Sequence, residues 1–162
     1  MVGMKIGVEL KISGDAGELF ADARALEAAG ADSFWAWLRV DGDDPWTVLA
    51  AIAAHTWRSR LILVDGIGRP DTRRTLQRLS RGRLVVAEAD GERLTVASGE
   101  GDPERWSRVG FPDGREAWLA LMRHHETEST DGLILPNDPR LLDLLRNPDV
   151  IEDRSDIRLA QG

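Results

Sequence analysis

Short apolar runs alternate along the chain with longer segments in which apolar residues recur every three or four positions. The short runs have the length of β-strands and cover Lys5 to Lys11, Ser33 to Leu38 and Leu61 to Val64. The longer segments between them have helical spacing. Three consecutive strand–helix units predict a parallel sheet with right-handed crossovers.

Aspartate and glycine mark the predicted ends of these helices. Asp15, Asp44 and Asp71 each stand where an N-cap is expected, and Asp44 is followed by a proline suited to the first helical turn. Gly30 and Gly82 stand where the first and third helices should end. The pattern therefore predicts three helices, each returning the chain to the start of a new strand.

The pattern changes after the third helix. Arg83 to Ala89 and Glu92 to Ser98 read as two strands, and Asp90-Gly91 between them is typical of a two-residue hairpin turn. This register would place Glu88 opposite Arg93 as a charged cross-strand pair. We therefore expect an antiparallel strand at the edge of the parallel sheet, where it would cover exposed backbone groups.

The remaining chain is less regular. Gly99 to Pro112 is rich in glycine, aspartate and proline and is predicted to be a loop. A helix is expected over Glu116 to His125, a buried strand over Asp131 to Leu135, and a last helix beginning at Asp138. Residues 150–162 have no clear period and are predicted to form a tail after a single domain over residues 1–149.

Composition narrows the class of protein. A chain of 162 residues with 42% hydrophobic and 30% charged residues is typical of one globular domain. The net charge of −7 argues against a nucleic-acid partner. The absence of cysteine excludes disulfides and thiol chemistry. No apolar run reaches the roughly 20 residues of a membrane span, and no signal-peptide pattern is present, so a cytoplasmic location is expected.

Several segments resemble the first half of the luciferase-like monooxygenases, the bacterial luciferase-type flavin- or deazaflavin-dependent oxidoreductases. The segments that carry the resemblance are Ala28 to Trp35, Asp44-Pro45-Trp46-Thr47, Ser59 to Leu63 and Thr75 to Arg83. The resemblance implies a TIM barrel, which needs roughly 250 residues. We therefore expect a truncated or degenerate member that forms an α/β fold: a partial (half) TIM barrel with parallel strands, an antiparallel hairpin edge and flanking helices.

The sequence departs from the family after Arg83. The family has small glycine-rich residues at this strand end, which let the cofactor approach the backbone, whereas this chain has Val85-Val86-Ala87-Glu88-Ala89-Asp90. The second half of the barrel, which holds the cofactor phosphate in the family, has no counterpart. We therefore expect no cofactor in a single chain, with FMN or deazaflavin as the alternative if a second copy completes the site.

The candidate site residues lie where the parallel strands should end, because barrel enzymes carry their chemistry at that face. The catalytic candidates are Asp65, Glu88 and Glu9, and the cofactor-binding candidates are Trp37, Arg69 and Arg73. Arg39 would lie at the same rim. The alternative is that the carboxylates are solvated or paired, that the tryptophans pack in the core or at an interface, and that the arginines form a solvated helix face. His124 and His125 are adjacent on a helix and diverge, so no metal site is predicted.

Three functions remain open from the sequence. The first is a non-catalytic accessory or interaction subunit. The second is a flavin- or deazaflavin-dependent oxidoreductase or monooxygenase whose site is completed by dimerisation. The third is a small-ligand-binding module. The expected partners are a second copy of the chain or another protein, because a half-barrel would leave an apolar sheet face uncovered.

Overall fold

A computed structural model of the protein describes residues 3–11, 15–38, 42–66, 69–97 and 101–147. The tail at residues 150–162 and Arg39 lie outside these residues. The strands are β1 (Lys5–Glu9), β2 (Ser33–Trp37), β3 (Arg60–Val64), β4 (Leu84–Asp90), β5 (Arg93–Val96), β6 (Glu104–Arg108) and β7 (Gly132–Pro136). The helices are α1 (Ala16–Ala28), α2 (Pro45–His55), α3 (Pro70–Leu79), α4 (Arg115–Thr127) and α5 (Leu141–Arg146).

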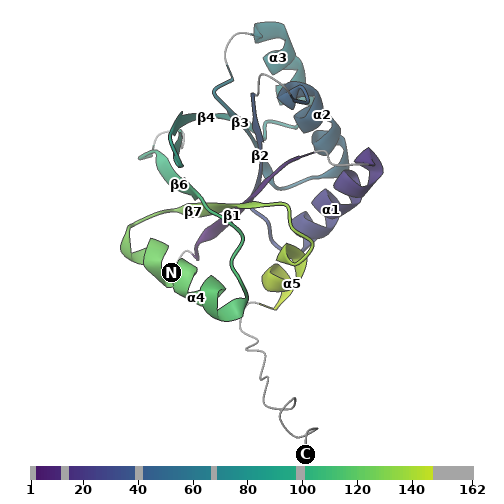
Figure 1. Cartoon of the computed structure of the whole chain (residues 1–162). Coiled ribbons are helices and arrows are strands. Elements are labelled where there is room, and N and C mark those ends of the chain that lie inside the picture. The colour runs from purple at the N-terminus through teal and green to yellow at the C-terminus, as the bar shows by residue number, and fades with distance from the viewer. Residues whose placement is uncertain (1–2, 12–14, 39–41, 67–68, 98–100, 148–162) are drawn as a thin grey trace, which may run out of the picture.

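The strands form a closed barrel in chain order, and β7 returns to pair with β1 (Figure 1). Five of the seven neighbouring pairs are parallel. The reversed strand is β5, which is antiparallel to both β4 and β6. The parallel strands therefore deliver their C-terminal ends to one end of the barrel, as in larger α/β barrels.

The prediction of a half-barrel is wrong, because a single chain closes the ring. The reason is economy of connection: a parallel crossover needs a helix, whereas antiparallel neighbours need only a turn. The chain links β4, β5 and β6 without helices, so three strands are formed by residues 84–108. The mixed α/β class and the parallel first half are as expected.

The hairpin after β4 is present, but its turn lies one residue later than predicted. Asp90 ends β4 and pairs with Arg93, so Gly91 and Glu92 form the turn. Glu88 lies opposite Thr95, and the predicted Glu88–Arg93 pair is wrong. Gly91 has a φ of 64° at the first turn position. Glycine favours that position in a two-residue hairpin turn because it lacks a Cβ atom.

Replacing Gly91 with valine is expected to lower the free energy of unfolding by about 1 kcal/mol or more, because a β-branched residue resists a positive φ. Chemical denaturation of both proteins measures the difference. Gly91→Asn is the control, since asparagine tolerates this conformation, and it should recover most of the loss. Equal stability of the valine variant and the parent would contradict the assigned turn.

Residues 99–112, predicted to form a loop, contain strand β6. Its sequence places Glu104, Trp106 and Arg108 on one face and Arg105 and Ser107 on the other. Trp106 is buried within the barrel. The strand was missed because it is short and charged, whereas a half-buried strand usually shows apolar alternation.

The helix starts agree with the sequence in two cases. Asp15 caps α1 by accepting a hydrogen bond from Gly17 N, and Asp44 caps α2 by accepting one from Thr47 N. Asp71 lies in the first turn of α3 instead of at its N-cap. The last helix begins at Leu141 rather than at Asp138.

Two apolar clusters hold the barrel together. One lies between the outer faces of the parallel strands and the helices, and the other fills the barrel interior. Trp35 and Trp106 meet in the interior with ring centroids 5.1 Å apart. Gly7 and Gly132 make room for these rings, since a Cβ at Gly7 would overlap Trp35 and one at Gly132 would overlap Trp106.

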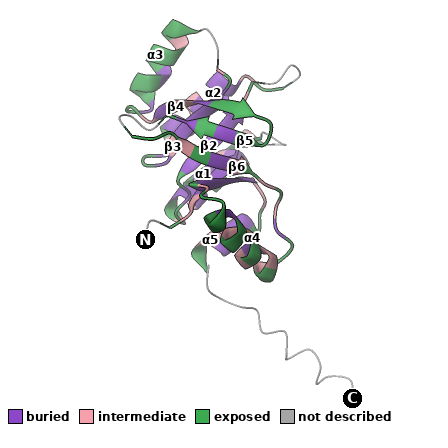
Figure 2. Ribbon diagram, turned by 90° about the vertical axis from the view of Figure 1, so that its left-hand side faces the viewer, coloured by how far each residue is buried: buried purple, intermediate pink, exposed green. Residues whose placement is uncertain are grey.

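The outer face of β5 and β6 is not covered by any helix of the described chain (Figure 1). Its outward residues are polar, namely Arg93, Thr95, Arg105 and Ser107. Figure 2 shows exposed positions along these strands. This face is therefore suited to water, and the uncovered apolar sheet expected from a half-barrel is not found among the described residues. Self-association stays a prediction without that support.

Candidate functional site

The C-terminal end of the barrel holds a compact group formed by Glu9, Trp37 and Arg108. The Arg108 guanidinium donates from Nε and from Nη2 to the Glu9 carboxylate at 2.8–2.9 Å. It also lies 5.0 Å from the centre of the Trp37 ring. Glu9 is 9% exposed, whereas the Arg108 side chain is 43% exposed. The predicted candidates Glu9 and Trp37 are thus brought together by an arginine that the sequence did not single out.

Trp37 packs against the interior cluster of the barrel, on the same face of β2 as Trp35. Its ring centroid is 6.1 Å from that of Trp35, which in turn contacts Trp106. Trp35 is fully buried and its Nε1 donates to Ser33 Oγ at 2.8 Å. The stacked tryptophans and the Glu9–Arg108 pair fill the part of the barrel near the C-terminal ends of the parallel strands. Side chains therefore occupy the barrel axis there.

Asp65 follows β3 at the same end of the barrel, with a positive φ of 52°. Its Oδ1 accepts a hydrogen bond from Ala89 N at 3.3 Å, which ties the end of β3 to the end of β4. The residue is exposed. This geometry gives the carboxylate a structural contact at a strand end, in the manner of an aspartate that stabilises a turn.

Replacing Asp65 with alanine is expected to lower the free energy of unfolding by about 1 kcal/mol, because the variant loses the bond to Ala89 N and keeps a positive φ without a polar side chain. Thermal denaturation measures the change. Asp65→Asn, which keeps an acceptor and tolerates positive φ, should be close to the parent. A large loss of ligand binding without loss of stability would instead place Asp65 in a binding site.

Glu88 is not brought to this group. Ala87 points into the barrel, so the alternation along β4 directs Glu88 outward, where it is exposed. The three carboxylates proposed from the sequence therefore do not converge. Among the described residues, no group of three or more His, Asp and Glu side chains is arranged to hold a metal ion.

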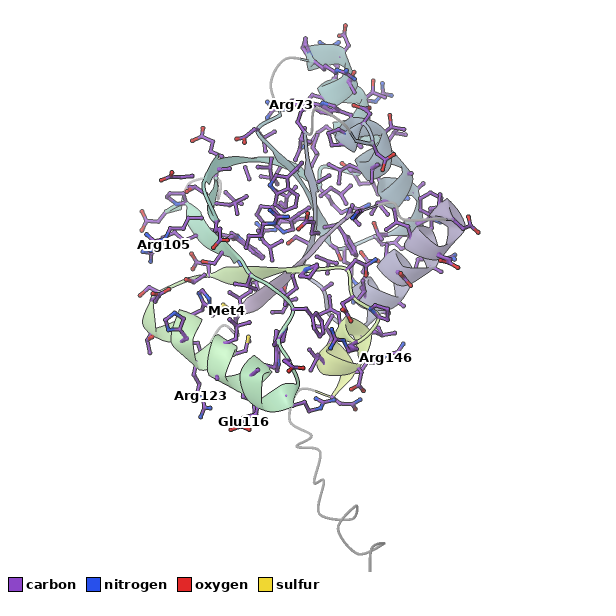
Figure 3. The ribbon with its side chains drawn as sticks, in the orientation of Figure 1. Met4, Arg73, Arg105, Glu116, Arg123 and Arg146 are labelled. Carbon is purple, nitrogen blue, oxygen red and sulfur yellow. The ribbon has the colours of Figure 1, made fainter. Side chains whose placement is uncertain are left out.

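The two candidate arginines lie outside the barrel. Arg69 Nη1 is 3.5 Å from Asp44 Oδ1, and both side chains are substantially exposed. Arg73 lies on α3 and is exposed (Figure 3). Arg108 binds Glu9 and Arg69 faces Asp44, so a flavin phosphate would have to compete with a carboxylate at either of these two guanidinium groups.

The opposite end of the barrel carries a loop that is held from two sides. The Glu27 carboxylate, at the end of α1, accepts hydrogen bonds from the backbone N–H groups of Trp57, Arg58 and Ser59 at 2.7–3.0 Å. Burial alone would raise the pKa of Glu27, but these amide bonds and one from the Ser59 side chain outweigh it and lower the pKa. The carboxylate therefore stays charged and fixes the loop.

Arg83 holds the same loop by donating hydrogen bonds to the backbone carbonyl oxygens of the loop. Its guanidinium donates to the carbonyl oxygens of Ala53, Thr56, Ser59 and Ser80 at 2.8–3.1 Å, and to Thr56 Oγ1 at 3.1 Å. This arginine connects the loop before β3 to the loop before β4. Glu27 and Arg83 together leave the backbone of residues 56–59 little freedom.

The side chain presented by this rigid loop is Trp57. It is 64% exposed, and Leu79, the last residue of α3, is 57% exposed. The Arg81 guanidinium carbon lies 3.9 Å from the centre of the Trp57 ring. Arg81 has a φ of 57°, a conformation that costs a non-glycine residue about 1 kcal/mol. An exposed tryptophan on a fixed backbone is typical of a binding hot spot.

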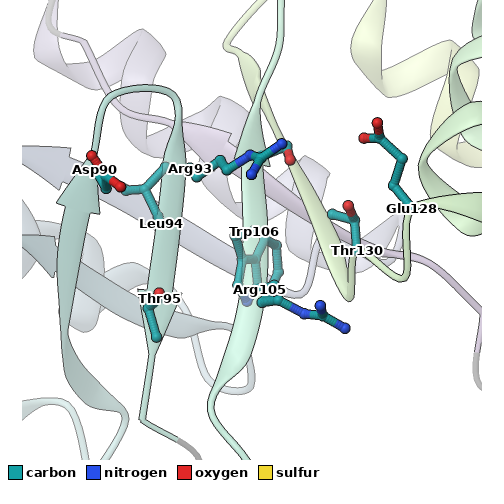
Figure 4. Close-up of a pocket in the computed structure, with 9 residues that line it drawn as sticks. Asp90, Arg93, Leu94, Thr95, Arg105, Trp106, Glu128 and Thr130 are labelled. Carbon is teal, nitrogen blue, oxygen red and sulfur yellow. The ribbon is translucent and has the colours of Figure 1, made fainter.

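A groove of about 420 Å³ lies on the side of the barrel, and Figure 4 shows its lining. It is formed by residues of β5 and β6, by Asp90 at the end of β4, and by Glu128 and Thr130 of the segment before β7. Its charges balance, with Arg93 and Arg105 against Asp90 and Glu128. Arg105 projects from the outside of β6 (Figure 3). A shallow, balanced surface of this kind favours no particular ligand class.

Comparison with known proteins leaves the ancestry open. No protein-family model matches the chain, and no curated protein sequence matches it. None of the helices in the described part of the chain combines the length and apolar character needed to cross a membrane. The resemblance to luciferase-like monooxygenases therefore remains a prediction, and the fold is that of a seven-stranded mixed α/β barrel.

Proposed function

We propose that this protein is a non-catalytic interaction subunit that binds a partner protein through the end of the barrel where the parallel strands begin. The observation that carries the proposal is Trp57, which is 64% exposed on a loop whose amides and carbonyls are held by Glu27 and Arg83. The Trp57 ring belongs to neither of the two apolar clusters of the protein. A preorganised aromatic side chain lowers the entropy lost on binding.

The distribution of carboxylates supports a binding role over catalysis. Glu9 is bound to Arg108, Asp65 accepts from Ala89 N, and Glu88 points away from the barrel. General acid–base chemistry needs a titratable group within hydrogen-bond reach of the reacting proton, and these carboxylates are used in structural contacts or lie apart. Their separation favours a scaffold whose working surface lies elsewhere.

The test compares the tagged full chain with Trp57→Ala and Leu38→Ala in quantitative capture from cells that produce the protein. Leu38 is the matched control because it is 57% exposed and follows β2 at the other end of the barrel. We expect a partner protein that the parent and Leu38→Ala retain equally and that Trp57→Ala binds about thirtyfold more weakly. Capture that is unchanged by the Trp57 substitution would contradict the proposal.

The competing function is a flavin- or deazaflavin-dependent oxidoreductase whose site two copies complete. Trp37 and the exposed part of Arg108 favour it, because an aromatic ring and a guanidinium at a barrel mouth are suited to a planar anionic ligand. A visible spectrum of the purified protein, before and after addition of FMN, separates the two functions. A stoichiometric yellow band that Trp37→Ala abolishes would establish the oxidoreductase.

A further inference from the structure

The surface around Trp57 has a charge opposite to that of the whole chain. Residues 56–60 and 78–83 contain five arginines and no aspartate or glutamate. Arg60 points into the barrel and binds Glu104, and Arg83 is used to hold the loop. The three others are exposed, namely Arg58, Arg78 and Arg81. We call Trp57, Leu79 and these three arginines the basic aromatic face.

Two acidic side chains, Glu27 and Asp32, border this face and leave it with an excess of positive charge. Glu27 keeps its negative charge while it holds the amides of the Trp57 loop, and the nearby charge of Arg83 offsets it. Asp32, at the start of β2, accepts a hydrogen bond from Ile6 N at 2.7 Å. The chain as a whole carries a net charge of −7. A concentration of positive charge in an acidic protein selects for a partner of opposite sign.

Arg81 adds a second observation. The residue after a helix C-cap is commonly glycine when its φ is positive, because glycine adopts that conformation without strain. Here an arginine takes the positive φ and stacks its guanidinium on Trp57, although Gly82 follows it. Glycine would relieve the backbone cost at this position, whereas the arginine offsets part of that cost by stacking on Trp57. The stacking also holds the charged guanidinium beside the exposed ring, where both are open to a partner.

We propose that the basic aromatic face binds an acidic segment of a partner protein, with one apolar side chain of that segment packed on Trp57 and Leu79 and its carboxylates paired with Arg58, Arg78 and Arg81. This inference rests on the proposed interaction function and adds the chemistry of the partner. Arginine favours such contacts because its planar guanidinium forms two parallel bonds to a carboxylate.

Two other occupants fit less well. A nucleic acid would be repelled at long range by the net charge of −7, and Leu79 offers it no partner. A second copy would have to place its acidic surface on the basic face of the first. That head-to-tail contact leaves another basic face free on each pair, so it gives a ring or a filament instead of a symmetric dimer.

The experiment selects peptides from a random displayed library on the immobilised full chain, with counter-selection against Trp57→Ala. The recovered peptides are synthesised, and their affinity is measured by titration calorimetry at low and high salt. The variants are Trp57→Ala, Arg81→Gly and Arg58→Glu. The controls are Leu38→Ala and Arg105→Glu, which lie on other surfaces. Arg81→Gly is decisive because relief of the positive φ offsets the loss of the stacking on Trp57, so the variant should fold about as stably as the parent.

We expect the recovered sequences to be rich in aspartate and glutamate around a leucine or an aromatic residue. Their affinity should fall about tenfold or more in each of the three variants and at high salt, and it should be unchanged in the controls. Peptides that depend on Trp57 but carry no acidic excess would overturn the acidic partner and leave the interaction function standing. Recovery of no peptide that depends on this face would overturn both.

Two further measurements decide between the occupants. Fluorescence anisotropy with single-stranded DNA and RNA oligonucleotides tests for nucleic-acid binding, and we expect the parent and Arg81→Gly to give the same result. Sedimentation at several concentrations tests for self-association, and we expect the parent and Trp57→Ala to give the same result. Weaker binding by Arg81→Gly in the first would assign the face to nucleic acid, and weaker association of Trp57→Ala in the second would assign it to a second copy. Either result would overturn the proposal.

Discussion

Replacing Glu104 with alanine is expected to lower the free energy of unfolding by about 3 kcal/mol. Lys5 and Arg60 are then left without their counter-ion at the end of the barrel where the parallel strands begin. Glu104 Oε1 accepts from Lys5 Nζ at 2.7 Å, and Oε2 accepts from Arg60 Nη2 at 2.7 Å and from Trp106 Nε1 at 3.0 Å. The loss falls at the lower end for a buried pair, since the Lys5 and Arg60 side chains remain 30% and 27% exposed. Denaturant titration measures it.

The same carboxylate makes stability depend on pH. Burial alone would raise the pKa of Glu104, but its bonds from Arg60, Lys5 and Trp106 outweigh burial and lower the pKa from 4.5 to about 2. A group with a depressed folded pKa contributes stability above its unfolded pKa and loses it as the pH falls. The parent should therefore lose stability between about pH 4.5 and pH 2.

Glu104→Gln is the matched variant. It keeps the size and one acceptor oxygen but cannot titrate, so its stability should fall less than that of the alanine variant and should change less over this pH range. Arg60 and Lys5 would repel each other in both variants. An alanine variant as stable as the parent at neutral pH would show that the network does not hold the barrel end.

The second large effect is expected at Glu27. Glu27→Ala removes the acceptor for the amides of Trp57, Arg58 and Ser59, and the free energy of unfolding should fall by about 3 kcal/mol because hydrogen bonds to a charged group are among the stronger ones. Because the folded pKa of Glu27 is lowered, the contribution of the carboxylate is also lost as the pH falls below the ordinary range of a glutamate.

Hydrogen exchange gives the local readout for Glu27. The three amides should lose protection in Glu27→Ala under conditions in which the interior strands stay protected. Glu18→Ala is the control, since Glu18 is exposed on the same helix, and its effect should stay within about 0.5 kcal/mol. Unchanged protection at Trp57 would mean that Arg83 alone fixes the loop.

The sequence predicted those structural features that depend on residues close together along the chain. Asp15 and Asp44 cap helices through amides two and three residues away, so their role is visible in the local pattern. The hairpin was predicted from Asp90-Gly91, but its register was off by one residue because Asp-Gly is compatible with more than one turn position.

The contacts that create the two ends of the barrel were not predictable in this way. Glu104 contacts Lys5, which is 99 positions away in the sequence, and Arg108 contacts Glu9 at the same sequence separation. In the sequence these residues belong to a charged segment that resembles a loop. The inward positions of β6 could have been recognised only by assuming a polar barrel interior, since Glu104 and Arg108 alternate around Trp106. The Glu27 and Arg83 clamp likewise joins segments about 30 residues apart.

Closure of the barrel by β1 and β7 affects the order in which the chain can fold during synthesis. The β4–β5 and β5–β6 hairpins can form as soon as residues 84–108 have emerged, because their contacts are local. The open side of β1 must wait for Gly132 to Pro136, the last strand of the ring. A nascent chain therefore carries an unpaired parallel edge from the synthesis of β1 until that of β7, and an unpaired edge of this kind promotes aggregation.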